Sequence, residues 1–378
     1  AQSFRYTPRG QVAQVEWEFD ELGAPQVVGY EYDGFGNETA IVHPDGTRIE
    51  TDYYDNGWVR SVPGFVGAVE YDARGMATNI AFANGVTSET TYTDGVGRAS
   101  SHRVVGPTGR VHEDLVFAHD ALSRATTITD QRLGTTRTHA YDLLQQLTSV
   151  DDDGTVTAFT YDGRDVVTNG ESDLELHYTD PLRPGLVTGT STGGGAVEAV
   201  ASDANGAITG LRGRQLVYDG TGDLVRVVTG ATTVDLAYDH RGERTHKRVS
   251  TGGAPIDTFF VGDRTEISGG QTIVHVVVGS WRIAVRRGAT TRWIHTDELG
   301  TGRFFTDETG RRIDGVTIKA FGNVDGGDVV GPQVFALHPL DAETGLYYAR
   351  RRYYSAELGR WITPDGLYLQ RPETDKGE

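Results

Sequence analysis

Tyrosine, arginine and acidic side chains are packed more densely between residues 340 and 370 than anywhere else, in the stretch LDAETGLYYARRRYYSAELGRWITPDGLYLQ. Guanidinium groups form ion pairs with carboxylates and stack on aromatic rings. The arginines here could therefore be solvated or stack on the tyrosines, and we expect a structural role for most of them. The residues concerned are Arg350, Arg351, Arg352 and Arg360, with Tyr347, Tyr348, Tyr353 and Tyr354. Strand alternation would place Arg350 and Arg352 on one side.

Other patterns with chemical meaning are weak. GTSTG (189–193) matches the GxSxG nucleophile elbow, but that elbow needs a strand before it and a helix after it. The glycine-rich VTGTSTGGGAV (187–197) predicts a flexible surface loop instead. DDDG (151–154) lacks the spaced ligands of a calcium loop and predicts a charged turn. With no HExxH pair among its 11 histidines and no cysteine, the sequence predicts no metal site and no cofactor.

The elements that position these residues follow from a repeat. An aromatic residue, an aspartate and a nearby glycine recur, as in YDGFG (32–36), YDARG (71–75) and YDHRG (238–242). Between Asp33 and Asp239 the aspartates have a mean spacing of about 20 residues. Aspartate bonds its own backbone and glycine takes the positive φ of a chain reversal, so each motif predicts a tight turn.

The segments between these turns alternate as half-buried strands do. In VEWEFD the apolar Val15, Trp17 and Phe19 alternate with acids. About 20 residues hold two strands of about six residues and two turns, so each repeat predicts a hairpin. A lone hairpin is marginal in water, whereas stacked hairpins share one sheet and one core. We expect the tyrosine before each turn to form a ladder with its equivalents in neighbouring repeats.

The composition agrees with an all-β chain and excludes some partners. Glycine accounts for 50 of 378 residues, and 37% of the residues are hydrophobic, which is enough for a packed core. A net charge of −18 repels nucleic acid and anionic lipid, so neither is an expected partner. The longest apolar run, IVHVVVGSWRIAV (273–285), is too short to cross a membrane and contains Arg282, so no membrane insertion is expected.

The repeats and the C-terminal motifs together resemble a known family. YDxxG repeats followed by IHTDELGTGRFFTDETGRRI, KAFGNV and DAETGLYYARRRYYSAELGRWITPD are similar to the Rhs, or YD-repeat, proteins of bacteria. Relatives of that family include the C subunits of insecticidal toxin complexes and the teneurins of animals. The resemblance implies spiralling antiparallel β-hairpin repeats that form a YD-repeat shell, a whole or partial cocoon, with a C-terminal plug.

The same resemblance divides the chain into a YD-repeat shell, residues 1–279, and an Rhs-associated core that plugs it, residues 280–378. It gives the plug a signature: Asp341, Gly345, Tyr347, Tyr348, Tyr353, Tyr354, Gly359, Arg360 and Trp361. It also implies a function, which is to enclose and present a C-terminal toxin or effector domain of the same polypeptide. Other shell segments or delivery proteins are further implied partners, and the implied location is secreted or at the bacterial cell surface.

Self-cleaving members of the family resemble aspartic proteases, in which two close carboxylates share a proton. The resemblance places the arginine of their pattern at Arg352 and the first aspartate at Asp365, 13 residues later. The motif here is DGLY (365–368), without the proline or the later glycine of the family pattern. A second aspartate and a cut site do not follow within the sequence. We therefore expect a fragment that ends before the cleavage segment, with autoproteolysis restricted to a longer parent.

Three functions stay open on the sequence. The first is an encapsulating shell, and the second is an autoproteolytic core that releases the C-terminal domain. The third is a cell-surface adhesion or glycan-binding module, as in the teneurins. No enzymatic activity is expected for the chain itself.

Overall fold

A computed structural model describes residues 1–93, 95–163, 165–279, 281–297, 299–314, 317–325 and 334–365. These residues form one short 3-10 helix, η1 (Asp20–Leu22), and strands β1 to β40. Each strand of a sheet pairs antiparallel with the next strand along the chain, so the ribbon is a continuous meander. None of its described helices is long and apolar enough to span a bilayer.

The first sheet has five strands and is followed by a two-stranded sheet. Its members are β1 (Gln2–Tyr6), β2 (Val12–Trp17), β3 (Gln26–Tyr32), β4 (Glu38–Val42) and β5 (Arg48–Glu50), then β6 (Asp52–Tyr53) and β7 (Val59–Ser61). A sheet of 13 strands continues the ribbon. It contains β8 (Val66–Tyr71), β9 (Ala77–Phe82), β10 (Thr87–Thr93), β11 (Arg98–Val105), β12 (Val111–His119), β13 (Ala125–Asp130), β14 (Thr135–Tyr141), β15 (Leu147–Asp152), β16 (Thr155–Asp162), β17 (Asp165–Asn169), β18 (Leu174–His177), β19 (Gly189–Thr192) and β20 (Glu198–Ala199).

A second sheet of 13 strands follows. It contains β21 (Ala201–Ser202), β22 (Ile208–Leu211), β23 (Arg214–Tyr218), β24 (Leu224–Thr229), β25 (Thr232–Tyr238), β26 (Arg244–Ser250), β27 (Ile256–Phe260), β28 (Thr265–Ser268), β29 (Gln271–Val278), β30 (Trp281–Arg287), β31 (Thr290–Thr296), β32 (Gly302–Thr306) and β33 (Arg312–Asp314). The chain ends in a pair, β34 (Thr317–Ile318) and β35 (Val324–Asp325), and a five-stranded sheet. That last sheet contains β36 (Val334–Phe335), β37 (His338–Asp341), β38 (Leu346–Ala349), β39 (Arg352–Ser355) and β40 (Arg360–Trp361).

The aspartate motifs form the turns that were predicted. Between β3 and β4, Asp33 accepts backbone N–H groups of Phe35 and Asn37 on Oδ1, at 2.8 and 2.9 Å. Gly36 closes the corner with a φ of 97°. The pattern is a short turn that ends in a residue with positive φ, and it repeats at Asp120, where the serine after the turn replaces glycine.

The tyrosine before each corner has a role that the sequence did not suggest. The register slips by one residue at this position, as between Ala237 and Tyr238, so a β-bulge precedes the turn. The hydroxyl then donates to a backbone carbonyl of the preceding hairpin, for example from Tyr32 to Val12 at 2.9 Å and from Tyr161 to Leu147 at 2.7 Å. The contact that recurs between repeats is therefore this hydrogen bond, although Tyr54 and Tyr71 also pack edge to face, with ring centroids 6.4 Å apart.

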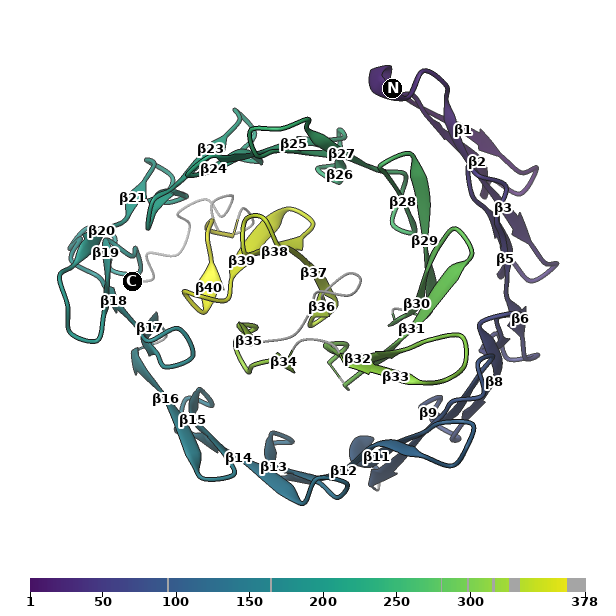
Figure 1. Ribbon diagram of the computed structural model, residues 1–378, viewed down its shortest axis with the longest axis horizontal. Coiled ribbons are helices and arrows are strands. Elements are labelled where there is room, and N and C mark those ends of the chain that lie inside the picture. Colours follow the sequence, from purple (N-terminus) through teal and green to yellow (C-terminus); the bar gives the residue numbers. More distant parts are fainter. Residues whose placement is uncertain are drawn as a thin grey trace, which may run out of the picture.

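The ribbon winds into a spiral whose ends overlap. In Figure 1 the strands go once around, and β28–β33 then run inside β1–β9. His43 contacts Thr265 across this overlap, with 2.8 Å between Nδ1 and Oγ1, and Asn84 donates to Thr306 at 2.9 Å. Both contacts join residues 222 positions apart, so one circuit consumes about that length of chain.

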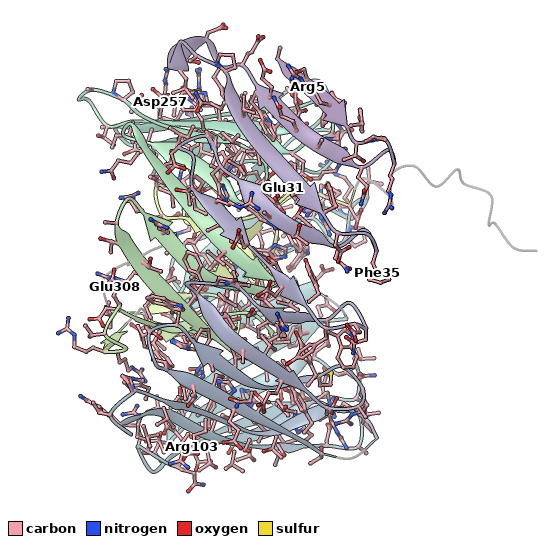
Figure 2. All side chains as sticks on the ribbon, turned by 90° about the vertical axis from the view of Figure 1, so that its right-hand side faces the viewer. Arg5, Glu31, Phe35, Arg103, Asp257 and Glu308 are labelled. Carbon is pink, nitrogen blue, oxygen red and sulfur yellow. The ribbon has the colours of Figure 1, made fainter. Side chains whose placement is uncertain are left out.

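Apolar side chains fill the space between the overlapping layers. Trp17 and Ile41 of the outer layer pack with Phe259 of the inner layer in one cluster, and Phe65 packs with Trp293 in another. Figure 2 shows this side of the molecule, with Phe35 of the outer layer at one edge and Glu308, from the β32–β33 turn of the inner layer, at the other. The two layers pack face to face, as in sheet-on-sheet structures.

The expected fold class is confirmed, because the described chain is a spiral of antiparallel hairpins with a C-terminal segment inside it. The boundary between residues 279 and 280 stays a prediction, and the second 13-stranded sheet runs across it. The loop expected at 187–197 is wrong in part, since β19 lies within it and pairs with both neighbours.

Candidate functional site

The segment from β36 to β40 lies inside the ring of strands (Figure 1). Leu346, Leu358 and Ile362 of this segment, which we call the inner curl (residues 334–365), are buried against the concave face of the sheet. Their neighbours there include Leu174 and Leu224, from opposite ends of a long stretch of ribbon. The interior of the spiral therefore has an apolar surface that binds a polypeptide segment.

Two pairs of tyrosines face each other across the β38–β39 hairpin. Tyr347 lies opposite Tyr354, and Tyr348 lies opposite Tyr353. Tyr347 and Tyr353 are buried, and the Tyr347 hydroxyl donates to the carbonyl of Gly322 at 2.6 Å.

The arginines of this hairpin do not behave as strand alternation predicted. Arg350 and Arg351 form its turn, and Arg350 has a φ of 59°. The expectation that Arg350 and Arg352 share one strand face is therefore wrong, because Arg350 is not in a strand. The aromatic partners also differ from those expected, since Arg352 stacks on Trp361 and Arg360 on Tyr178.

Asp341 of the inner curl is the centre of a buried ion-pair network. Its side chain is 4% exposed and pairs with Arg244, whose side chain is 3% exposed. Lys247 contacts the other oxygen of Asp341 at 3.1 Å and contacts Glu343 at 3.1 Å. The Arg244 guanidinium also lies over the rings of Phe260 and Tyr348, at 4.4 and 4.3 Å from their centroids.

Burial and charge act against each other in this network. Burial alone would raise the pKa of Asp341, but the charges of Arg244 and Lys247 outweigh it and lower the pKa. Burial alone would likewise lower the pKa of Lys247, but Asp341 and Glu343 raise it. All three groups are therefore charged near neutral pH, and the curl is held by a desolvated charge network.

A second contact between inner curl and sheet involves Glu357. This carboxylate forms a salt bridge with Arg214 and lies 3.2 Å from Arg212. Arg214 also donates to the carbonyl of Thr344 at 3.1 Å.

The signature glycines shape the turns of the inner curl. Gly345 has a φ of 69° and its N–H donates to the carbonyl of Asp341 at 2.8 Å. Gly359 has a φ of 64°, and a Cβ there would lie 3.1 Å from the ring of Phe321. Both positions therefore favour glycine.

The structure brings the predicted pair Arg352 and Asp365 together. Their closest nitrogen and oxygen lie 3.3 Å apart, with side chains 31% and 45% exposed. Trp361 lies under the Arg352 guanidinium at 4.2 Å, so the arginine is oriented from two sides. Residues 366–368 of the DGLY motif lie outside the described residues. The arrangement provides one oriented carboxylate, which is half of the pair that aspartic protease chemistry needs.

The remaining signature residue, Arg360, links the inner curl to the shell. It donates to the Tyr178 hydroxyl at 2.8 Å and to the Gly185 carbonyl at 2.9 Å, and it lies 3.5 Å from Asp165. Arg360 is thus a tether between the inner curl and the ends of two hairpins.

The weaker sequence motifs gain no catalytic arrangement. Ser191 of GTSTG lies on β19, so the strand-to-helix context of a nucleophile elbow is not met. Its hydroxyl lies 2.8 Å from His177 and 3.1 Å from Glu175. In the part of the chain that the structure describes, no group of three or more histidines and acids is placed to hold a metal ion.

Sequence reasoning missed the sheet residues that hold the inner curl, namely Arg244, Lys247 and Arg214. One signal for them existed. Lys247 is one of three lysines in a chain with 35 basic residues, and it lies two positions before Val249, on the same face of the predicted strand. A rare charged residue on the core face of a strand indicates a buried partner.

The chain matches the family model described as Teneurin YD-shell over residues 66–376. It superposes on the crystal structure of TcdB2-TccC3-TEV with a TM-score of 0.77 at 16% identity, covering 97% of this chain and 22% of that one. For TcdB2-TccC3 the TM-score is 0.76 at 16% identity, with coverages of 96% and 23%. For the Tc holotoxin pore of Photorhabdus luminescens, with a substitution in TccC3, it is 0.70 at 15% identity, with coverages of 94% and 22%.

The chain thus spans less than a quarter of the length of these solved structures. No curated protein matches it in sequence. The solved structures share the spiral of hairpins, and the family match extends over most of that spiral and the inner curl. On the strength of that match, the chain belongs to the teneurin YD-shell family.

Proposed function

We propose that this chain is part of a structural shell that encloses and presents a C-terminal toxin or effector domain of a bacterial Rhs-type polymorphic toxin. The observation that carries the proposal is the position of the inner curl. The concave face of the sheet already binds one segment of its own polypeptide through buried leucines and a buried charge network. The TcdB2-TccC3 complexes, whose shells have the same fold, support the assignment to toxin biology.

This function brings partners and a location with it. The partners are the C-terminal domain of the same polypeptide, further shell segments and delivery proteins, and the location is outside the cell or at the bacterial surface. The inner curl acts as the plug between the shell wall and the enclosed domain. Its tethers at Asp341, Glu357 and Arg360 hold it to the wall at three separate places.

Protease protection tests the enclosure. The gene product that contains this chain, extended to its natural ends, is digested with a nonspecific protease and compared with the same protein after Asp341→Asn. We expect the downstream domain to be protected in the parent and degraded faster in the variant. A downstream domain that is digested at the same rate as a free, separately expressed copy would refute enclosure.

The pair of Arg352 and Asp365 supports a second candidate function. We propose that a longer parent cleaves itself downstream of this chain, with Asp365 as one carboxylate and Arg352 as the residue that orients it. Two carboxylates that share a proton can activate water and protonate the leaving amide. The observation that favours this is the 3.3 Å ion pair, which holds Asp365 in one orientation at the end of the inner curl.

Expression of the extended gene tests the cleavage. We expect two fragments from the parent and one uncut product from Asp365→Asn. A matched control is Asp219→Asn, which changes a corner aspartate that accepts only local hydrogen bonds. Cleavage that persists in Asp365→Asn would remove the protease proposal and leave the shell proposal intact.

A further inference from the structure

The structure contains a cavity of about 1560 Å³. Its wall is formed by strands of the β26–β31 region, by the first hairpins of the outer layer and by the inner curl near Asp341. Pockets for small ligands usually measure about 300–1,000 Å³, so the space exceeds the requirement of a small molecule. A stretch of polypeptide is the kind of ligand that matches this size.

The cavity wall has many more cationic side chains than the acidic chain has on average. Eight arginine and lysine side chains line it against six carboxylates, whereas the whole chain has a net charge of −18. Most of the carboxylates are already paired. Glu266 contacts His275 at 2.8 Å, and Asp341 and Glu343 contact Lys247. Two of the lining arginines pair with carboxylates outside the cavity, Arg264 with Glu38 at 2.7 Å and Arg292 with Glu308 at 3.2 Å. Among the described residues, the lining cations without an ion pair are Arg282 and Arg287.

Arg282 is the more buried of these two arginines. Arg282 lies opposite Val277, which also lines the cavity, and a β-bulge separates this pair from Val276 and Ala284, which pack between the layers. Its Nη1 is buried and has no hydrogen-bond partner among the described residues. Burial lowers the pKa of Arg282, and Glu266 and Asp263 offset that effect only in part. A buried guanidinium without a partner is costly, and an anion placed beside it would remove the cost.

Two other cations of the same wall already have carboxylate partners, and these partners indicate which kind of anion would pair with Arg282. Arg244 and Lys247 line the cavity too, and each is paired with a carboxylate from a polypeptide segment, the inner curl. Arg282 is a further cation on this wall that no carboxylate occupies. We propose that the cavity binds an acidic polypeptide segment, with a carboxylate of that segment paired to Arg282. The proposal rests on the proposed enclosing function and specifies the charge of the enclosed chain.

Peptide binding tests the site with the chain as it is. A short labelled poly-glutamate peptide is titrated with the protein and followed by fluorescence anisotropy, with poly-serine as the uncharged comparison. We expect poly-glutamate to bind and poly-serine not to bind. The net charge of −18 repels a polyanion at long range, so binding requires a local cationic site.

Arg282→Gln should weaken poly-glutamate binding at least about tenfold, since it removes a charge-assisted contact in a partly desolvated site. The matched control is Arg286→Gln on the same strand, because Arg286 bonds only the Gly288 carbonyl and does not line the cavity. Circular dichroism checks that both variants fold.

Three results would overturn the proposal. The first is no poly-glutamate binding by the parent, and the second is equal binding by the parent and Arg282→Gln. The third is binding of inorganic phosphate alone, lost in the variant, which would show a small-anion site. None of these results affects protease protection of the downstream domain, so the site and the enclosing function fail independently.

Discussion

The hydroxyl of Tyr238, at a corner of the shell, lies 3.0 Å from the hydroxyl of Tyr353 in the inner curl. Tyr238 donates its single proton to the carbonyl of Leu224 at 2.6 Å, so the proton between the two tyrosines belongs to Tyr353. Arg244 in turn lies 3.4 Å from the Tyr353 hydroxyl. The hydroxyl that donates to the neighbouring repeat thus also accepts a hydrogen bond from the inner curl.

Removing the Tyr238 hydroxyl should destabilise both the sheet and the attachment of the inner curl to it. Tyr238→Phe deletes two hydrogen bonds, each contributing about 0.5–1.5 kcal/mol, so we expect the free energy of unfolding to fall by about 1–3 kcal/mol. Urea denaturation followed by tyrosine and tryptophan fluorescence measures it. Tyr6→Phe is the matched control, because Tyr6 is 61% exposed and should change stability little. An equal loss in both variants would contradict the role assigned to Tyr238.

Asp341→Asn should lower the free energy of unfolding far more than a substitution at its more exposed neighbour, Glu343. It leaves Arg244 buried without its counter-ion and removes one of the two carboxylates that contact Lys247, and breaking a buried pair costs about 3–5 kcal/mol. Glu343→Gln is the matched comparison, since the Glu343 side chain is 32% exposed and such pairs contribute at most about 1 kcal/mol. Denaturation midpoints of the two variants, measured side by side, test the difference.

A compensating variant separates charge from packing. In Arg244→Met, Lys247→Met and Asp341→Leu combined, no unpaired buried charge remains, and stability should return close to that of the parent. If the combined variant were as unstable as Asp341→Asn, lost packing rather than unpaired charge would explain the loss of stability.

Acid should lower the stability of the parent in the same way as Asp341→Asn does, because it neutralises the Asp341 carboxylate. The pKa of Asp341 is lowered in the folded state, so its contribution is complete above about pH 3.9 and is lost as the pH falls further.

The corners and hairpins could be predicted because their chemistry is local. An aspartate that caps its own turn, a glycine with positive φ and alternating flanks all lie within one repeat, as at Asp33 and Gly36. The tyrosine was recognised as part of the repeat, but its bond was not. Its acceptor lies on the preceding hairpin, and which carbonyl it reaches depends on the bulge at each corner.

The overlap of the spiral could not be predicted from spacing. The partners of His43 and Asn84 lie 222 residues away, and nothing in the repeat fixes the curvature that brings them together. The buried partners of Asp341 were missed for the same reason, since Arg244 is 97 residues away. The resemblance supplied the signature of the inner curl, but not the side chains of the sheet that hold it.

The effect of the backbone conformation at a corner can be tested separately from side-chain packing. Gly46 has a φ of 80° and a Cβ there would meet nothing within 4 Å, while Gly34 has open space and no positive φ. Gly46→Ala should therefore cost about 1 kcal/mol from the left-handed conformation alone, and Gly34→Ala should cost little. Equal denaturation midpoints for the two variants would contradict this account of the corner.

The contact between His43 and Thr265, which joins the overlapping layers, should weaken in mild acid. Burial lowers the pKa of His43 to about 4, against about 6.5 in the unfolded chain. The unfolded state therefore binds the proton first, so the stabilisation is complete above about pH 6.5 and declines as the pH falls toward 4. Between pH 7 and pH 5 this loss is about 2 kcal/mol.

Two variants isolate this effect in urea denaturation at pH 7, 6 and 5. His43→Gln removes the titrating group, so its stability should vary less with pH than that of the parent by about 2 kcal/mol over this range. Thr265→Val removes the hydrogen-bond partner of His43 but leaves the imidazole buried, so it should lower stability by a similar amount at each pH. A His43→Gln profile parallel to that of the parent would show that acid acts elsewhere. His43 lies on the outer layer and its partner Thr265 lies on the inner layer. If the stability of His43→Gln varies less with pH than that of the parent, protonation of this imidazole is what weakens the contact between the two layers.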